Sequence, residues 1–191
     1  MQQRVCNFST KRPFNGWGHW WPLLIGPVAM VLVYVAHVLQ WSRLLDKSLQ
    51  ETLALVITVL AFVGFAIRYY RGRSPVHLIL VVLAVVFFCR EVHFAGTSSG
   101  VYVALVVIGA WAIHWRRRLK PLMDGGQLRF WLVSTFATYL LSQLIARRVF
   151  RFLPHESELH IPLEEIVENV AHLMFFVTSF VGRRQGSISR T

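Results

Sequence analysis

The sequence has only two cysteines among its 191 residues, too few for a disulfide framework. Cys6 lies in the N-terminal tail and Cys89 in an apolar run, and the topology predicted below places them at opposite ends of a bilayer. Bridged cysteines need Cα atoms within about 7 Å, so no disulfide is expected. Internal repeats, low-complexity segments and a separate soluble domain are also lacking, and we expect residues 1–191 to form a single membrane domain.

High apolarity and high charge occur together in this chain. Hydrophobic residues make up 55% of the sequence and the mean hydropathy is +0.50, while the formal net charge is +11. The two properties are segregated, because long apolar runs alternate with short basic clusters. This pattern is typical of membrane proteins, whereas nucleic-acid-binding proteins gather basic residues on a polar face, so no nucleic-acid partner is expected.

Six apolar stretches have the length of about 20 residues that a helix needs to cross the hydrocarbon core. Pro22 and Pro162 should lie in the first turns of the first and last of these helices. No small-residue cleavage site follows the first stretch, so we expect a retained helix rather than a signal peptide. The predicted fold is an all-α, polytopic bundle of six transmembrane helices, with approximate ranges 21–42, 49–70, 75–94, 99–115, 128–149 and 162–181.

The basic residues predict the orientation of the bundle, because they are enriched in cytoplasmic loops. With both termini in the cytoplasm, fourteen lysines and arginines fall inside and six outside. The inner set is Arg4, Lys11, Arg12, Arg68, Arg71, Arg73, Arg116, Arg117, Arg118, Lys120, Arg129, Arg183, Arg184 and Arg190. The outer set is Arg43, Lys47, Arg90, Arg147, Arg148 and Arg151. We therefore expect a multi-pass protein of the inner (plasma) membrane whose inner clusters contact anionic lipid head groups.

Ionisable residues gather in the outer half of the predicted bundle. On an ideal helix, residues three, four and seven apart share one face. Near the start of the last predicted helix, four polar residues have this spacing: Glu165, Glu168, Asn169 and His172. Charged groups at membrane depth are costly and mark functional sites by default. The predicted cluster consists of Arg90, Glu91 and His93 at the end of the third helix, Glu165, Glu168, Asn169 and His172 on the last, and His37 on the first.

This cluster admits several interpretations. Arg90 could form a structural ion pair with Glu91 or Glu168 that joins the third and last helices. Carboxylates and imidazoles are also ligands of zinc, iron or manganese, although no H-E-x-x-H motif is present. The candidate metal ligands are Glu91, His93, Glu165, Glu168 and His172. Glu168 and His172 could instead form a proton relay.

A polar stripe on the fifth predicted helix is interpreted more simply. Small hydroxyl residues in membrane helices commonly support helix packing. We assign that role to Thr135, Thr138, Tyr139 and Ser142.

The segment from Gly96 to Leu105 resembles the start of the fourth helix in rhomboid intramembrane serine proteases, which also have six helices and cytoplasmic termini. The resemblance implies that Ser99 is a nucleophile and that His172, in the last helix, is the base that activates it. Thr97 stands where the rhomboid pattern has a glycine, and no histidine–asparagine oxyanion pair is present in the second helix.

A second resemblance covers both ends of the charged cluster. The motif Arg90-Glu91-x-x-Phe94, followed late in the chain by Glu164-Glu165-x-x-Glu168, is similar to a loose group of small bacterial inner-membrane proteins. It implies no activity, but it indicates that Arg90, Glu91, Glu165 and Glu168 define the site.

Taken together, the sequence favours a small membrane protein that serves as a subunit or as an accessory or binding protein of a membrane complex. Its expected partners are membrane lipids and other membrane subunits. A metal-dependent or rhomboid-like serine hydrolase is the first alternative, and a proton- or cation-coupled transporter is the second. The sequence assigns no substrate, cofactor or oligomeric state.

Overall fold

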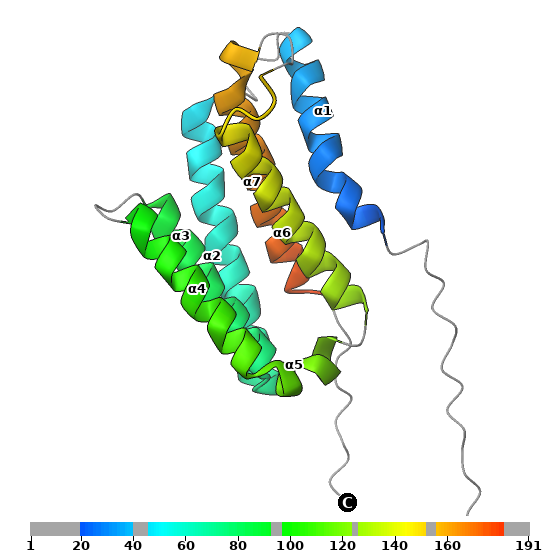
Figure 1. Ribbon diagram of the computed structural model, residues 1–191, viewed down its shortest axis with the longest axis vertical. Helices are drawn as coiled ribbons and strands as arrows, with labels where there is room; N and C mark the ends of the chain where they lie inside the picture. The colour runs from blue at the N-terminus through cyan, green and yellow to red at the C-terminus, as the bar shows by residue number, and fades with distance from the viewer. Residues whose placement is uncertain (1–19, 40–45, 93–96, 124–125, 152–155, 182–191) are drawn as a thin grey trace, which may run out of the picture.

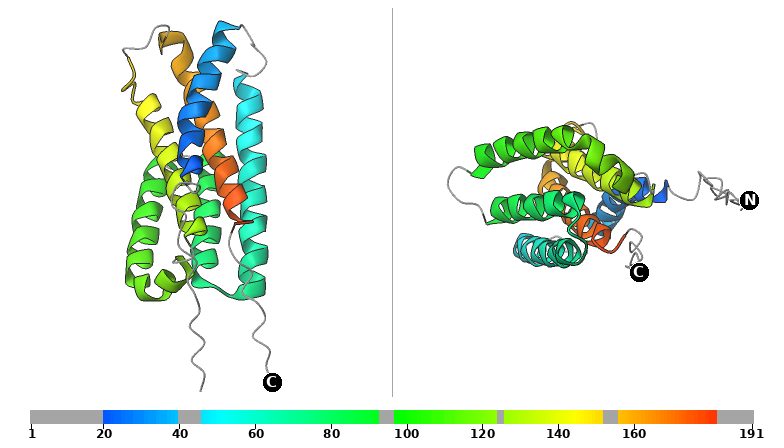
Figure 2. Two further views of the ribbon diagram at one scale, coloured as in Figure 1. Left: turned by 90° about the vertical axis from the view of Figure 1, so that its right-hand side faces the viewer. Right: turned by 90° about the horizontal axis from the view of Figure 1, so that it is seen from below.

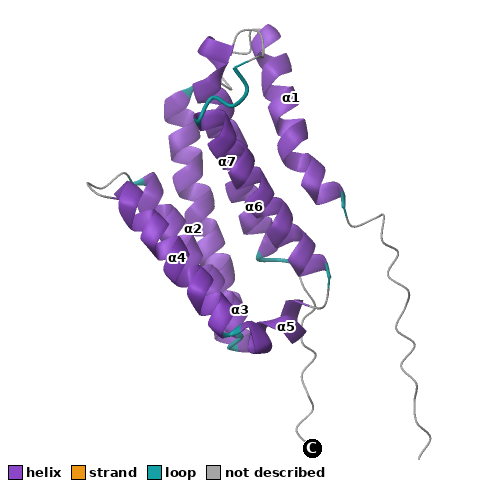
Figure 3. Cartoon of the chain, viewed as in Figure 1, coloured by secondary structure: helices purple, strands orange, loops and turns teal. Residues whose placement is uncertain are grey.

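The computed structural model describes residues 20–39, 46–92, 97–123, 126–151 and 156–181, with only the backbone described at 97–99, 121–123 and 156–158. This described part is helical and contains no strand, which confirms the all-α prediction (Figure 3). A 3-10 turn, η2 (Trp21–Leu24), leads into the first α-helix. The α-helices are α1 (Ile25–Val38), α2 (Lys47–Gly72), α3 (Pro75–Glu91), α4 (Thr97–His114), α5 (Arg116–Met123), α6 (Gln127–Ala146) and α7 (Glu156–Thr178).

The long helices run alternately up and down in an elongated bundle (Figure 1). Helix α7 holds the central position, because it packs against α1, α2 and α6. Helix α3 packs against both α2 and α4, so that α4 lies at the periphery (Figure 2). The short α5 lies at the lower end, where it links α4 to α6 and contacts α3 (Figure 1).

Local sequence signals account for both ends of α2. The side chain of Asp46 accepts a hydrogen bond from the backbone N–H of Ser48 at 3.1 Å, which satisfies one of the free donors of the first turn. At the other end Arg73 adopts a left-handed conformation with φ 44° and ends the helix. Pro75 then opens α3 at a first-turn position, where its missing N–H costs nothing.

Two glycines allow neighbouring helices to approach closely. A Cβ atom added to Gly64 on α2 would lie 2.4 Å from Ser179 Oγ, and one added to Gly26 on α1 would lie 2.8 Å from Thr138 Oγ1. Small residues at such crossings let helix backbones pack tightly in membranes, where dispersion replaces the hydrophobic effect as the driving force.

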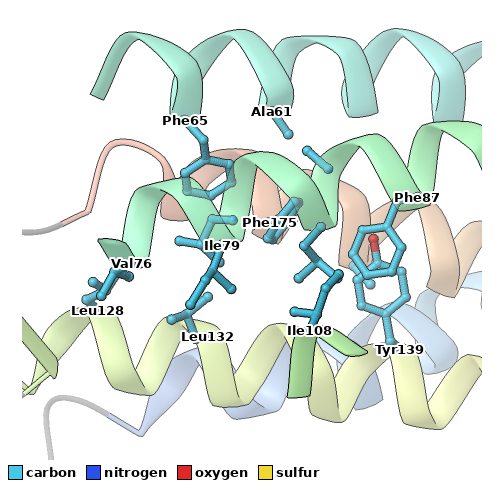
Figure 4. Packing of buried hydrophobic residues seen from close by; sticks show 14 residues of the cluster. Ala61, Phe65, Val76, Ile79, Phe87, Ile108, Leu128, Leu132, Tyr139 and Phe175 are labelled. Carbon is cyan, nitrogen blue, oxygen red and sulfur yellow. The ribbon is translucent and has the colours of Figure 1, made fainter. Parts of the chain in front are cut away.

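The lower half of the bundle has an aromatic and aliphatic core. Phe65 of α2 packs against Phe175 of α7 with ring centroids 4.8 Å apart, and Phe87 of α3 lies 5.5 Å from Phe175 (Figure 4). Leu83 and Ala84 of α3 are also buried in this core. Large apolar side chains are exposed along the outside of the bundle, as expected of a surface that faces lipid; examples are Val31, Leu32, Val59, Val63, Val103, Val106, Phe136 and Leu140.

Three helices in the described residues are long and apolar enough to cross a membrane: Trp21–Val38, Lys47–Gly72 and Gln127–Ala146. These segments fit a membrane protein. Helix α3 has 17 residues, and α7 carries five glutamates, so length and composition alone do not identify these two as spans.

The structure differs from the prediction in two helices. Helix α7 begins at Glu156, so Pro162 lies inside it, and the prediction that Pro162 occupies the first turn is wrong. Six residues of the helix precede the proline. They are mostly polar, so hydropathy does not predict that the helix extends over them. Helix α5 (Arg116–Met123) lies between the predicted spans 99–115 and 128–149, where hydropathy predicts no helix because the segment is basic.

Candidate functional site

An ion pair joins α3 to α7 in the upper half of the bundle. Arg90 Nη2 donates to Glu168 Oε2 at 2.8 Å, and Arg90 Nη1 contacts Glu168 Oε1. Two parallel contacts of this kind make a bidentate guanidinium–carboxylate pair, which fixes orientation as well as charge. The Glu168 side chain is nearly buried at 11% exposure, while the Arg90 side chain remains 31% exposed. The pair therefore reaches from the interior to one edge of the bundle.

The imidazole of His172 lies beside this pair and has no exposed surface. Its Nδ1 is 2.5 Å from the hydroxyl of Tyr139 on α6, and its Nε2 is 3.3 Å from Glu91 Oε1 at the end of α3. A neutral ring that carries its proton on Nε2 satisfies both contacts, because Tyr139 then donates to Nδ1 and Nε2 donates to Glu91. Three helices thus meet at one side chain.

Three potential ligand groups converge at this point. One ligand atom from each of Glu91, Glu168 and His172 can be chosen so that all lie within 4.8 Å of one another. Phe87 closes the site from the apolar side, since its ring packs on Tyr139 at 4.6 Å (Figure 4) and lies 5.9 Å from the ring of His172. Formal charges sum to −1 when Arg90 is charged, both glutamates are ionised and His172 is neutral. The site therefore has room for one additional positive charge.

The polar residues in the middle of α7 face different neighbouring helices. The side-chain amide of Asn169 donates to the Gln50 carbonyl at 3.0 Å and to Gln50 Oε1 at 2.7 Å, so it faces α2. Glu165 also faces α2, where its Oε1 lies 3.9 Å from Lys47 Nζ. The stripe that the sequence placed on one helix face is therefore split, with Glu168 and His172 toward α3 and α6 and the other two toward α2.

The remaining predicted residues are placed as follows. His37 lies half-buried in the last turn of α1 and is not among the three converging ligand groups. His93 lies outside the described residues. Ser99 lies in the first turn of α4, but its side chain also falls outside the described part, so its pairing with His172 stays a prediction. The neighbours of His172 that the structure does describe are Tyr139 and Glu91.

Sequence reasoning missed the roles of Tyr139 and Gln50. Tyr139 was assigned to helix packing, yet it is the partner of His172. Its signal was present in the sequence, because a tyrosine at membrane depth needs a hydrogen-bond partner and His172 is predicted at similar depth. Gln50 gave no comparable signal, since a glutamine at the end of an apolar run is also compatible with an exposed position.

Comparison with known proteins identifies no matching family model, no matching curated protein and no matching solved structure. The functional proposal therefore rests on the geometry of the site.

Proposed function

We propose that this chain is a multi-pass protein of the inner (plasma) membrane, with six spans and both ends in the cytoplasm. We further propose that it serves as an accessory or binding subunit of a membrane complex. The observation that carries the proposal is the buried network of Arg90, Glu91, Tyr139, Glu168 and His172. It joins three helices and reaches the bundle edge at Arg90.

The arrangement of charge along the bundle supports the topology. The basic residues of the α2–α3 connection and of α5 lie at the lower end (Figure 1), opposite the charged network. In the proposed orientation this lower end faces the cytoplasm, in accordance with the positive-inside rule. The other end carries Asp46, Glu51 and Glu91, which the rule neither requires nor forbids.

The topology is tested by labelling single cysteines in whole cells. In a background carrying Cys6→Ser and Cys89→Ser, the exposed positions Lys47 and Arg117 are changed to cysteine one at a time. A membrane-impermeant maleimide should label the Lys47→Cys protein in intact cells. It should label the Arg117→Cys protein only after permeabilisation. The opposite result would reverse the orientation. Equal labelling of both proteins in intact cells would contradict the odd number of spans, α2, α3 and α4, proposed between the two positions.

The binding role is supported by the partial exposure of the network. Arg90 and Glu91 form its outer edge, with side chains 31% and 13% exposed, whereas His172 is fully enclosed. A polar or charged group of a neighbouring subunit can therefore reach the edge without opening the bundle. Arg90 is paired with Glu168 and still partly exposed, so a polar or charged group of a neighbouring subunit can add a further contact at this edge.

The binding role is tested by purification in native lipid. The wild-type chain should copurify with another membrane protein at a fixed stoichiometry. Glu168→Gln should lose that partner, because it removes the charge that orients Arg90. The matched control is Glu165→Gln, which lies one turn earlier on α7 but contacts Lys47 instead. If both variants lose the partner, or if neither does, the network does not bind the partner and the proposal is contradicted.

A second candidate function is proton-coupled transport. The specific observation in its favour is the chain of contacts from Tyr139 through His172 to Glu91, which leads from the bundle interior toward its edge. Reconstituted vesicles with an enclosed pH-sensitive dye test this function. Proton flux that His172→Gln abolishes would favour it over the accessory role.

A further inference from the structure

The geometry points to a divalent transition-metal site formed by Glu91, Glu168 and His172, with Tyr139 as the residue that positions the histidine. Zinc or a zinc-like ion fits the ligand set, because imidazole and carboxylates are among its usual protein ligands. This inference concerns what the network binds and does not depend on whether the chain is a subunit of a complex.

The separation of two of the ligands already matches a tetrahedral site. In tetrahedral zinc centres, metal–ligand distances near 2.0–2.1 Å place neighbouring ligand atoms about 3.4 Å apart. His172 Nε2 and Glu91 Oε1 are 3.3 Å apart, which is long for a strong hydrogen bond but close to this separation. All three ligand atoms lie within 4.8 Å of one another, so an ion requires them to approach by about 1.4 Å at most.

Tyr139 provides the outer contact that metal-binding histidines usually have. Its hydroxyl lies 2.5 Å from Nδ1, the ring nitrogen that does not contact Glu91, and so holds Nε2 toward the Glu91 carboxylate. When a metal occupies Nε2, the ring proton moves to Nδ1 and the Tyr139 oxygen accepts it in a hydrogen bond. Such second contacts fix the tautomer and typically change metal affinity by about 10–100-fold.

Arg90 competes with the metal for the Glu168 carboxylate. Its guanidinium occupies both oxygens of Glu168, and its charge opposes a cation at the neighbouring position. With both carboxylates ionised the site carries a net charge of −1, so a divalent ion leaves it at +1. Without Arg90 the occupied site would be neutral, so removal of Arg90 should tighten binding. With three protein ligands, one tetrahedral position stays open, which is the arrangement found in catalytic rather than structural zinc sites.

The test uses the full-length protein in detergent, stripped of metal with a chelator and then titrated with Co²⁺ and with Zn²⁺. Cobalt should give visible d–d bands of a tetrahedral centre, and zinc should abolish them at one equivalent per chain. Glu91→Gln and His172→Gln should lose these bands. Tyr139→Phe should keep them but weaken the affinity about 10-fold, and Arg90→Gln should strengthen it.

Controls separate this site from adventitious binding and from misfolding. Glu165→Gln leaves all three ligands in place and should bind cobalt like the wild type. Glu91→Asp retains the charge near Arg90 but withdraws the carboxylate, so it tests the ligand if Glu91→Gln does not fold. If the bands persist in the ligand variants, the metal binds at other histidines and the proposal is overturned. Absence of bands in a folded wild-type protein overturns it equally, and the His172–Glu91 contact is then a hydrogen bond only.

Discussion

The contacts of α7 form a polar half and an apolar half, which hold the helix in the bundle by different physics. The polar half, made by Glu168, Asn169 and His172, contacts α2, α3 and α6 through hydrogen bonds and an ion pair. The apolar half, around Phe175, contacts α2 and α3 through close-packed rings. Polar contacts depend on direction and partner, while apolar packing depends mainly on shape. The polar half therefore selects which helices meet and in which register, and the apolar half supplies most of the cohesion.

The largest effect is expected from breaking the apolar half. Phe175→Ala should destabilise the protein by about 3–5 kcal/mol, because it removes a buried ring that contacts both Phe65 and Phe87. Unfolding in mixed micelles, followed by circular dichroism, measures the change. Leu173→Ala on the same helix is the control, since Leu173 is 47% exposed and its loss should matter little. Equal losses in the two variants would contradict a core centred on Phe175.

Breaking the polar half should cost less. Glu168→Gln should destabilise the bundle by about 1–3 kcal/mol, below the range for a fully buried pair, because Arg90 is partly exposed and recovers some hydration. The same unfolding assay measures it, and Glu165→Gln should be nearly neutral. A loss as large as that of Phe175→Ala would mean that the polar half also provides the cohesion.

The close helix crossing at Gly64 tests whether packing around the apolar half is rigid. Gly64→Ala should destabilise by about 1–2 kcal/mol, because the new Cβ would lie 2.4 Å from Ser179 Oγ. Gly109→Ala is the matched control, as its Cβ meets nothing within 4 Å and alanine favours the helix. The control should be neutral or stabilising, and a neutral Gly64→Ala would show that Ser179 moves aside without cost.

The smallest effect is expected at Asn169. Asn169→Leu removes two hydrogen bonds to Gln50 and should cost about 0.6–1 kcal/mol, the size measured for interhelical hydrogen bonds in membranes. The pair of variants Asn169→Leu and Gln50→Leu, combined in a double-mutant cycle, isolates this contact. Fully additive effects would show that the contact contributes nothing to stability.

Much of the fold could be predicted from the sequence, because apolar runs and basic clusters are local properties. The helical class follows from them, and the gathering of Arg90, Glu91, Glu168 and His172 follows from the cost of charge at membrane depth. The pairings could not be predicted in the same way. Glu165 and Glu168 are three residues apart on one helix, yet one contacts Lys47 and the other Arg90.

That difference depends on the rotation of α7 between its neighbours, which tertiary packing determines rather than helical periodicity. The start of α7 escaped prediction for a related reason. Hydropathy locates the apolar part of a helix, but the polar turns before Pro162 extend it toward the bundle edge. A proline at this position removes one backbone donor without ending the helix, so its presence alone does not mark a boundary.

The central place of α7 also has a consequence for how the protein is made. Helices α1, α2, α3 and α6 leave the ribosome before α7, so in the proposed topology Gln50, Arg90 and Tyr139 enter the membrane before Asn169, Glu168 and His172 have been synthesised. Until α7 arrives, these groups depend on water, lipid head groups or a helper protein for their hydrogen bonds. We therefore expect chains arrested before α7 to be the forms that quality-control proteases and insertase chaperones recognise.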